Sequence, residues 1–282
     1  MIHELHSGAF PVKFVNFSVA ACAVAIALPA SAADKAAPPA NPGWTVTLRA
    51  NGYLAPQYEG SKTLAPMAAP GFGLRRAGTE AAFSTPDDSI SYALFDAGWL
   101  KAGPAGRFKS ARRARDHNEL AGLRDVDWTI EGGVFAEIWP MEKLRARVEA
   151  LRNFHGPQGV DINSGVDWVE KTGAWTLALG PRLSIANDHF MRAYFSVTPA
   201  EALLSGNLGA YRAKSGIKSY GVAGSANYRW NQSWDTTFYG GYDRLAHAAA
   251  ASPIVAKTGS RNQFTVGAIV AYSFDVEGFK LW

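Results

Sequence analysis

The sequence predicts an all-β protein: a transmembrane antiparallel up-and-down β-barrel of about 12 strands, with about 10 to 14 possible. Three observations support this prediction. Apolar and polar residues alternate along runs of about ten residues, the length of a tilted strand that crosses a bilayer. The N-terminus has the pattern of an export signal. Charged residues make up 18% of the 282-residue chain, against roughly 25% in an average soluble protein.

The first segment of the chain indicates export rather than part of the fold. Lys13 precedes a mostly apolar run that ends at Leu28, and a small-residue triplet ends at Ala32, as in a cleaved signal peptide. Lipidation of Cys22 is the alternative, but the apolar run continues past that residue. We therefore expect three parts: a signal peptide at 1–32, a flexible leader at 33–43 and an outer-membrane barrel at 44–282.

Composition argues against several kinds of site. A single cysteine leaves no disulfide framework and no multi-cysteine metal site. The histidines lack H-x-x-x-H or H-E-x-x-H spacing, and no serine sits in G-x-S-x-G. The net charge of +4 is too small to indicate a nucleic-acid partner. We therefore expect no catalytic residue, no cofactor, no metal and no nucleic acid.

The clearest alternation runs from Asp125 to Ile138. Tryptophan and aliphatic residues occupy one set of alternate positions, and the other set carries four carboxylates. A strand gives these sets opposite faces, whereas a helix would scatter the carboxylates around its surface. The segment Met141–Phe154 fits both periods, and we expect a strand because its neighbours are strands, with a short helix as the alternative.

Similar patterns place the expected strands along the whole chain. They begin near Trp44, Pro66, Ser89, Trp99, Asp125, Glu142, Gly159, Gly173, His189, Gly216, Ser233 and Asn262. Asn231–Gln232 forms a tight periplasmic turn in this scheme, and the longer Thr198–Ser215 and Ala246–Arg261 face outward. Counting strands places the basic stretch Arg107–Arg115 on the periplasmic side although it lies in a long connection. Either a strand is miscounted there or the periplasmic loop is unusual.

The charged residues on the polar faces have two interpretations. The candidates are Arg49, Asp125, Asp127, Glu131, Glu137, Arg145, Arg147, Glu149, Arg182 and Arg229. Paired carboxylates can perform acid–base hydrolysis. The favoured interpretation is that these charges face a polar barrel lumen and pair with one another.

A basic cluster is the sharpest charged feature of the sequence. It consists of Arg107, Lys109, Arg112, Arg113 and Arg115. The favoured interpretation is a solvated loop. The alternative is contact with an anionic partner, which is murein or a periplasmic protein if the loop points inward and lipopolysaccharide phosphates if it points outward.

Three patches carry a family resemblance. They contain Tyr58, Gly60 and Ser61; then Tyr194, Phe195, Val197, Thr198 and Pro199; then Ser252, Pro253, Gly259, Ser260, Arg261, Asn262 and Gln263. In this order they resemble the MltA-interacting protein (MipA/OmpV) family of outer-membrane barrels. The chain departs from the family pattern at Ser196, where a glycine is usual, and continues past Phe274 to Trp282.

The resemblance implies a non-enzymatic protein of the cell outer membrane, in contact with outer-membrane lipid and lipopolysaccharide. It implies a scaffold or accessory role that bridges a murein transglycosylase and a murein synthase. A small-solute channel and a surface adhesin or stress-response protein are the alternatives on the same barrel. If the protein is a scaffold, a murein transglycosylase or synthase should co-purify with it in a pull-down. If it is a channel, it should conduct ions in planar bilayers.

Overall fold

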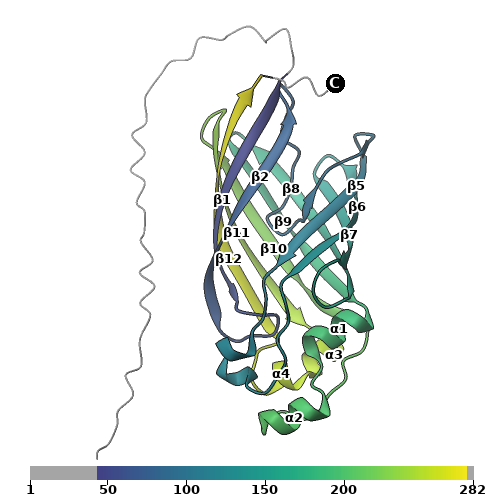
Figure 1. The fold of residues 1–282 in the computed structure, drawn as a ribbon. Coiled ribbons are helices and arrows are strands. Elements are labelled where there is room, and N and C mark those ends of the chain that lie inside the picture. The colour runs from purple at the N-terminus through teal and green to yellow at the C-terminus, as the bar shows by residue number, and fades with distance from the viewer. Residues whose placement is uncertain (1–42, 278–282) are drawn as a thin grey trace, which may run out of the picture. The chain divides into compact units, whose positions relative to one another are not determined.

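The computed structural model describes residues 43–277, so the predicted signal peptide, the leader up to residue 42 and Trp282 lie outside them. One antiparallel sheet of twelve strands curls around an interior (Figure 1). The predicted fold class is therefore confirmed. The ten long strands are β1 (Trp44–Pro56), β2 (Leu64–Arg76), β5 (Leu100–Lys109), β6 (Thr129–Met141), β7 (Leu144–Asn153), β8 (Val160–Thr172), β9 (Trp175–Ala186), β10 (Gly216–Arg229), β11 (Trp234–Leu245) and β12 (Asn262–Val276). Two-residue strands, β3 (Ile90–Ser91) and β4 (Phe95–Asp96), pair with β5.

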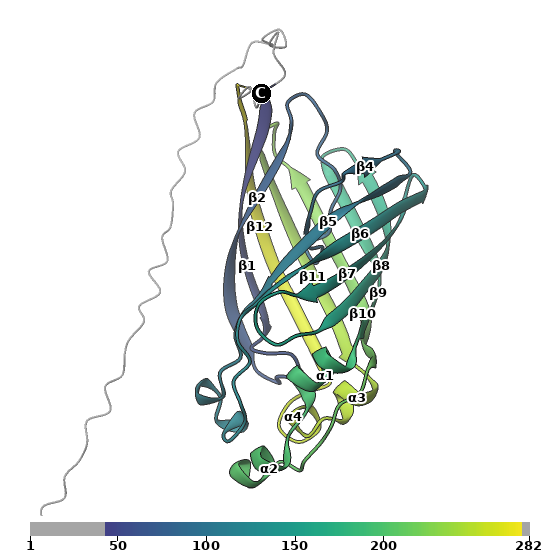
Figure 2. The same cartoon turned by 45° about the vertical axis from the view of Figure 1, so that its right-hand side comes forward.

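The two ends of the curled sheet differ. At the end called here the short-turn end, tight connections such as Gly173–Ala174 join neighbouring strands, and β1 begins where β12 ends. The helices of the described residues gather at the opposite end, the helix end (Figures 1 and 2). They are η1 (Ala114–Asp116), η2 (Asn118–Leu120), α1 (Asp188–Phe195), α2 (Pro199–Ser205), α3 (His247–Ala251) and α4 (Pro253–Ala256). None of these helices is long and apolar enough to cross a membrane.

One of the expected strands was wrong, and another is much shorter than expected. The one near His189 is helix α1, whose N-cap Asn187 accepts a hydrogen bond from the Phe190 amide. Phe190 and Tyr194 are both buried and lie one helical turn apart on the same face of α1. This spacing is typical of an amphipathic helix. The strand near Ser89 is reduced to the short β3 and β4, which do not span the sheet. By contrast Leu144–Asn153 is a strand, as expected.

The reduced strand near Ser89 changes the side on which the basic stretch lies. β5 begins at the short-turn end and finishes at Lys109, beside the helices. Arg107–Arg115 therefore lies at the helix end and not with the short turns. The expected side was wrong because the stretch near Ser89 was counted as a strand that crosses the sheet.

Strand alternation sorts the side chains into two faces. On β7, Val148 is exposed outward while Arg147 and Glu149 on either side of it are buried in the interior. The same order along the other strands leaves an apolar outer surface. Its exposed residues include Leu48, Leu54, Phe72, Val134, Ile138, Ile162, Val166, Leu177, Leu179, Val222, Phe238, Val266 and Val270. A face of this kind suits contact with hydrocarbon.

Tryptophans concentrate at the short-turn end. Trp44, Trp99, Trp139, Trp168, Trp175, Trp230 and Trp234 lie at or near strand ends there. Trp175 contacts Tyr228 and Trp234 contacts Tyr272, each with ring centroids 4.7 Å apart. Aromatic rings with one apolar side and one polar atom favour the membrane–water boundary.

The sheet has two free edges, β2 and the segment Ile90–Asp96. Pairing with β1 and β5 makes both edges run toward the short-turn end, so they are parallel to each other. Within residues 43–277 no backbone ladder joins them. Proline has no N–H, so Pro66 and Pro70 of β2 must turn their nitrogens away from β1 and toward the free edge.

Candidate functional site

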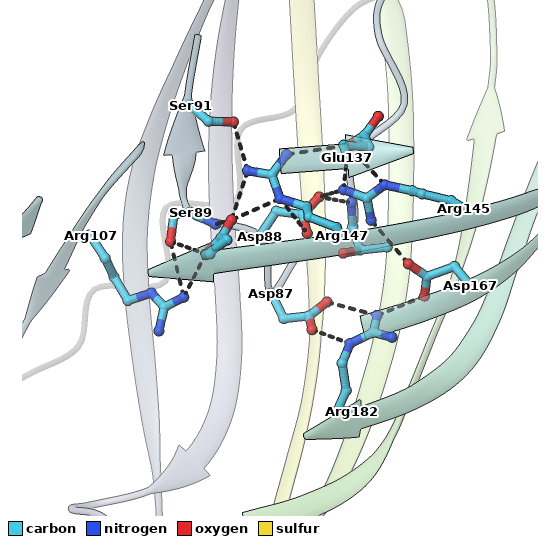
Figure 3. A network of polar contacts seen from close by, with 12 residues as sticks. Asp87, Asp88, Ser89, Ser91, Arg107, Glu137, Arg145, Arg147, Asp167 and Arg182 are labelled. Atoms are coloured by element: carbon cyan, nitrogen blue, oxygen red, sulfur yellow. Dashed lines mark hydrogen bonds and ion pairs between the residues drawn. The ribbon is translucent and has the colours of Figure 1, made fainter. Parts of the chain in front are cut away.

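A segment that is not a strand passes through the interior of the curled sheet. After β2 the chain returns among the inward side chains, and Thr85–Ser89, called here the lumen segment, contacts β7 and β9 (Figure 3). Thr85 and Ser89 are buried. The lumen segment thus occupies space that an open barrel would leave to water.

Asp88 anchors the lumen segment to two buried arginines of β7. Its carboxylate contacts both Arg145 and Arg147 (Figure 3). Arg145, whose side chain is 1% exposed, also donates to Glu137 at 3.0 Å and to Asp167 at 3.0 Å. A guanidinium so enclosed is stable only because several carboxylates surround it.

Asp87 forms the second anchor. Arg182 of β9 donates to its two carboxylate oxygens at 2.6 and 3.3 Å, a bidentate pair. Arg182 also contacts Asp167 at 2.8 Å. Unlike Asp88, the Asp87 side chain is 46% exposed, so it borders open space inside the sheet.

A third contact joins the lumen segment to β5. Ser89 donates its hydroxyl to Glu149 at 2.5 Å, and Arg107 donates to both of them, at 3.0 Å to Ser89 and 3.1 Å to Glu149. Every charged partner here is inward on its strand. Side chains from separate strands therefore hold one short segment by charge-assisted hydrogen bonds.

A second charged group, the lysine cluster, lies nearer the helix end. It consists of Lys109, Lys218, Glu59, Glu131 and Asp161, joined by contacts of 3.1 to 3.9 Å. Both ammonium groups also lie over the ring of Phe190, at 4.5 and 4.7 Å from its centroid. Cation–π contacts of this kind hold α1 across the mouth of the sheet.

Glu59 lies in the loop after β1 and is held in its charged form. Burial raises the pKa of this carboxyl, but Lys109 and Lys218 outweigh that effect and lower the pKa from 4.5 to about 2. The group therefore stays ionised in all but strong acid.

The predicted lumen charges are placed unequally. Glu131, Glu137, Arg145, Arg147, Glu149 and Arg182 lie in the two networks. Arg49 lies on the inward face of β1, beside Gly71. Asp125 and Asp127 precede β6 and are exposed, and Arg229 is exposed at the short-turn end.

Sequence reasoning missed several members of the networks. These are Glu59, Asp87, Asp88, Asp161, Asp167 and Lys218. Asp161 and Asp167 share one face of β8 at even spacing, a signal that could have identified them. Asp87 and Asp88 lie outside the regular strands, where no periodicity operates.

The predicted basic cluster is divided by the fold. Arg107 and Lys109 point inward and belong to the two networks. Arg112 is buried and donates to the Tyr194 carbonyl at 2.8 Å. Only Arg113 and Arg115 remain exposed at the helix end.

The residues of the three resembling patches meet at the helix end. The Gly60 amide donates to the Gln263 side chain at 2.9 Å, and the Gly60 carbonyl accepts from the Ser260 amide at 2.8 Å. Gln263 also donates to the Ser61 carbonyl at 3.2 Å. A Cβ on Gly259 would lie 1.9 Å from the Gly60 carbonyl oxygen, so only glycine permits this approach.

The second patch joins the third in the same way. The Ser252 hydroxyl, fully buried, donates to the Phe195 carbonyl at 2.6 Å. Thr198 caps α2 in a capping box with Glu201, and Pro199 begins the helix. Val197 and Ile254 lie in one buried apolar cluster with Tyr58. The three patches therefore form one packed cap, called here the helix cap.

Two cavities adjoin the lumen segment. One, of about 290 Å³, lies between Asp87 and the inward faces of β1, β11 and β12. The other, of about 300 Å³, lies nearer Glu59 and Lys218. Asp87, Arg182 and Asp243 line both cavities.

The charged groups of the interior hold the lumen segment in place. Among residues 43–277 no cluster of three or more His, Cys, Asp or Glu side chains is arranged to hold a metal ion. The carboxylates of the networks are mostly paired with arginine or lysine, as structural ion pairs are.

Comparison with known proteins gives one broad match. Residues 50–274 match the protein family described as MltA-interacting protein MipA. No curated protein matches the chain.

Several solved structures are distantly similar. An outer membrane channel from Pseudomonas putida F1 is 12% identical with a TM-score of 0.42, over 84% of this chain and 97% of that one. The CymD monoaromatic hydrocarbon channel is 10% identical with a TM-score of 0.40, over 84% and 89%. The NanC porin is 8% identical with a TM-score of 0.36, over 82% and 100%. All three TM-scores are below 0.5, so nothing about function follows from them.

Proposed function

Since the chain belongs to the MltA-interacting protein (MipA) family, we propose that it is a non-enzymatic scaffold that bridges a murein transglycosylase and a murein synthase. The family description names the first partner. The second is proposed because a scaffold that joins cutting to synthesis needs both activities at one place.

The observation that supports this proposal is that the chain's own segment obstructs the interior. The lumen segment is anchored through Asp87 and Asp88 to arginines of two strands, and Phe190 of α1 lies against the lysine cluster. A barrel interior obstructed by a segment of the same chain favours a docking role over free passage of solutes.

Placement in the cell outer membrane is supported by the apolar outer face and by the tryptophans of the short-turn end. Barrels of this class keep short turns in the periplasm and long connections outside. The short-turn end would then face murein and its enzymes. Arg113 and Arg115 would face outward, where lipopolysaccharide phosphates are the available anions.

Co-purification tests the proposal. The full chain carrying an affinity tag is extracted in detergent and captured, and the bound proteins are identified by mass spectrometry. We expect a murein transglycosylase and a murein synthase to be enriched over the same capture with an unrelated tagged barrel. Absence of both from a folded, heat-modifiable preparation would contradict the scaffold role.

A further inference from the structure

The two cavities adjoin each other inside the sheet. They share Asp87, Arg182 and Asp243 as a common wall, and we call their joint space the lumen compartment. Each cavity, at about 290 and about 300 Å³, is of the size that encloses a small solute. The compartment lies apart from the short-turn surface on which the proposed scaffold partners would dock.

Polar groups line the compartment without protein partners. Thr85, 6% exposed, lines the first cavity and Ser184, 7% exposed, lines the second; neither hydroxyl has a hydrogen-bond partner among residues 43–277. The partly exposed Asp243 side chain borders both cavities, and its carboxylate makes no ion pair or hydrogen bond with other side chains or backbone of residues 43–277. Buried polar groups seek partners, so this arrangement is suited to a hydrogen-bonding ligand.

The wall chemistry selects one class of ligand. The wall combines carboxylates, paired cations, hydroxyl and amide groups with apolar surface from residues such as Ala69, Ala178 and Leu183, so it suits a ligand that has both polar groups and a carbon skeleton. Of the cations on the wall, Arg182 is already bound to Asp87 and Asp167, and Lys218 contacts Glu59. An inorganic anion would meet these carboxylates, whereas a ligand hydroxyl can both donate to Asp243 and accept from the Thr85 or Ser184 hydroxyl.

We propose that the lumen compartment binds a small, uncharged polyhydroxylated solute of monosaccharide size. Vicinal hydroxyls of the solute donate to the Asp243 carboxylate and accept from hydroxyl groups of the wall. The rings of Tyr53 and Tyr239, both in the wall of the first cavity, provide apolar surface for the carbon skeleton. The Thr85 and Ser184 hydroxyls complete the hydrogen bonds.

The test uses the full chain in detergent micelles and saturation-transfer NMR with D-glucose, ethanolamine and sodium phosphate as separate probes. We expect saturation transfer from the protein to glucose and none to ethanolamine or phosphate. Asp243→Asn removes the unpaired charge and breaks no ion pair; because a hydrogen bond to a charged group is lost, glucose should bind about tenfold more weakly. Asp235→Asn, on the same face of the same strand but outside both cavities, is the matched control and should bind normally.

Ser184→Val is the second variant, because its extra bulk reduces the second cavity without removing a paired group. Heat-modifiable gel migration establishes that each variant is folded. The proposal is supported if saturation transfer to glucose is weaker in Asp243→Asn and in Ser184→Val than in the parent protein. Transfer to ethanolamine or phosphate in place of glucose, no transfer to any probe, or equal glucose binding in the folded variants would overturn it. None of these results depends on a protein partner, so failure here leaves the scaffold proposal standing.

Discussion

The Gly60 amide and the Gln263 side chain, 203 positions apart in sequence, form a buried hydrogen bond of 2.9 Å. The bond joins the loop after β1 to the start of β12, and a second bond from Gln263 to the Ser61 carbonyl strengthens the joint. Two patches of the family resemblance thus meet at one side chain. The residues that carry the family resemblance therefore pack the helix cap together.

Gln263→Leu should loosen this joint. The substitution leaves the Gly60 amide and the Ser61 carbonyl buried without their partner, and we expect the free energy of unfolding to fall by about 2 to 4 kcal/mol. Urea denaturation in detergent measures the change. Gln158→Leu, at an exposed position, is the control and should be nearly neutral. A Gln263→Leu variant as stable as the parent would mean that the cap does not depend on this side chain.

Gly259→Ala should disturb the same joint through shape alone. Its Cβ would lie 1.9 Å from the Gly60 carbonyl oxygen and 2.7 Å from that of Ile254, so the backbone must move. We expect a loss of about 2 kcal/mol or more in unfolding free energy. Gly209→Ala, with no atom within 4 Å of the added Cβ, is the matched control. Equal stability of the two variants would refute the close approach.

Acid should weaken the contact between Glu59 and the two lysines. Burial raises the pKa of Glu59, but Lys109 and Lys218 lower it further, to about 2 from 4.5. A lowered pKa in the folded state gives stability that is present above pH 4.5 and is lost as the pH falls toward 2. The contribution is at most about 3 kcal/mol.

The measurement compares unfolding free energies of the parent and Glu59→Gln between pH 5 and pH 2. The parent should lose stability more steeply with acid, because the variant has no proton to bind at this position. Glu80→Gln, at an exposed position, should follow the parent. Identical slopes for parent and Glu59→Gln would show that the lysine contacts do not hold the carboxylate charged.

Releasing the lumen segment should open a path for ions. In the double variant Asp87→Ala with Asp88→Ala, the segment loses its ion pairs, while Glu137, Glu149 and Asp167 still pair with the wall arginines. The sheet should therefore stay folded. We expect stepwise conductance in planar bilayers from the double variant and none from the parent.

Asp96→Ala is the control for conductance, since Asp96 pairs with Lys101 at an exposed site away from the lumen segment. It should behave like the parent. Steady conductance by the parent itself would favour the channel alternative over the scaffold. A silent double variant that is folded would mean that other residues obstruct the interior.

Much of the wall could be predicted from period-two alternation, because each long strand has one face toward lipid and one toward polar groups. Arg145, Arg147 and Glu149 stand at alternating positions of β7, and this pattern alone places them together inside. The strand predicted near His189 failed for a local reason. Phe190 and Tyr194 are spaced for a helix face, and Asn187 supplies an N-cap.

The lumen segment could not be predicted from local pattern. Asp87 and Asp88 follow Pro86 in a stretch without regular hydrogen-bonding period, and their positions depend on arginines about 60 to 95 residues later. An ion pair between residues far apart in the sequence produces no repeating pattern of residue types in the segment around either partner. Counting that stretch as a crossing strand also reversed the expected side of the basic stretch.

The prolines on the free edge of β2 have a consequence for how the chain is made. A barrel under assembly exposes its strand edges to other unfinished chains, and an edge with a full row of donors can recruit a neighbour's strand. Pro66 and Pro70 remove two of those donors. Chains crowded together during export should therefore separate as single molecules rather than join edge to edge into ribbons.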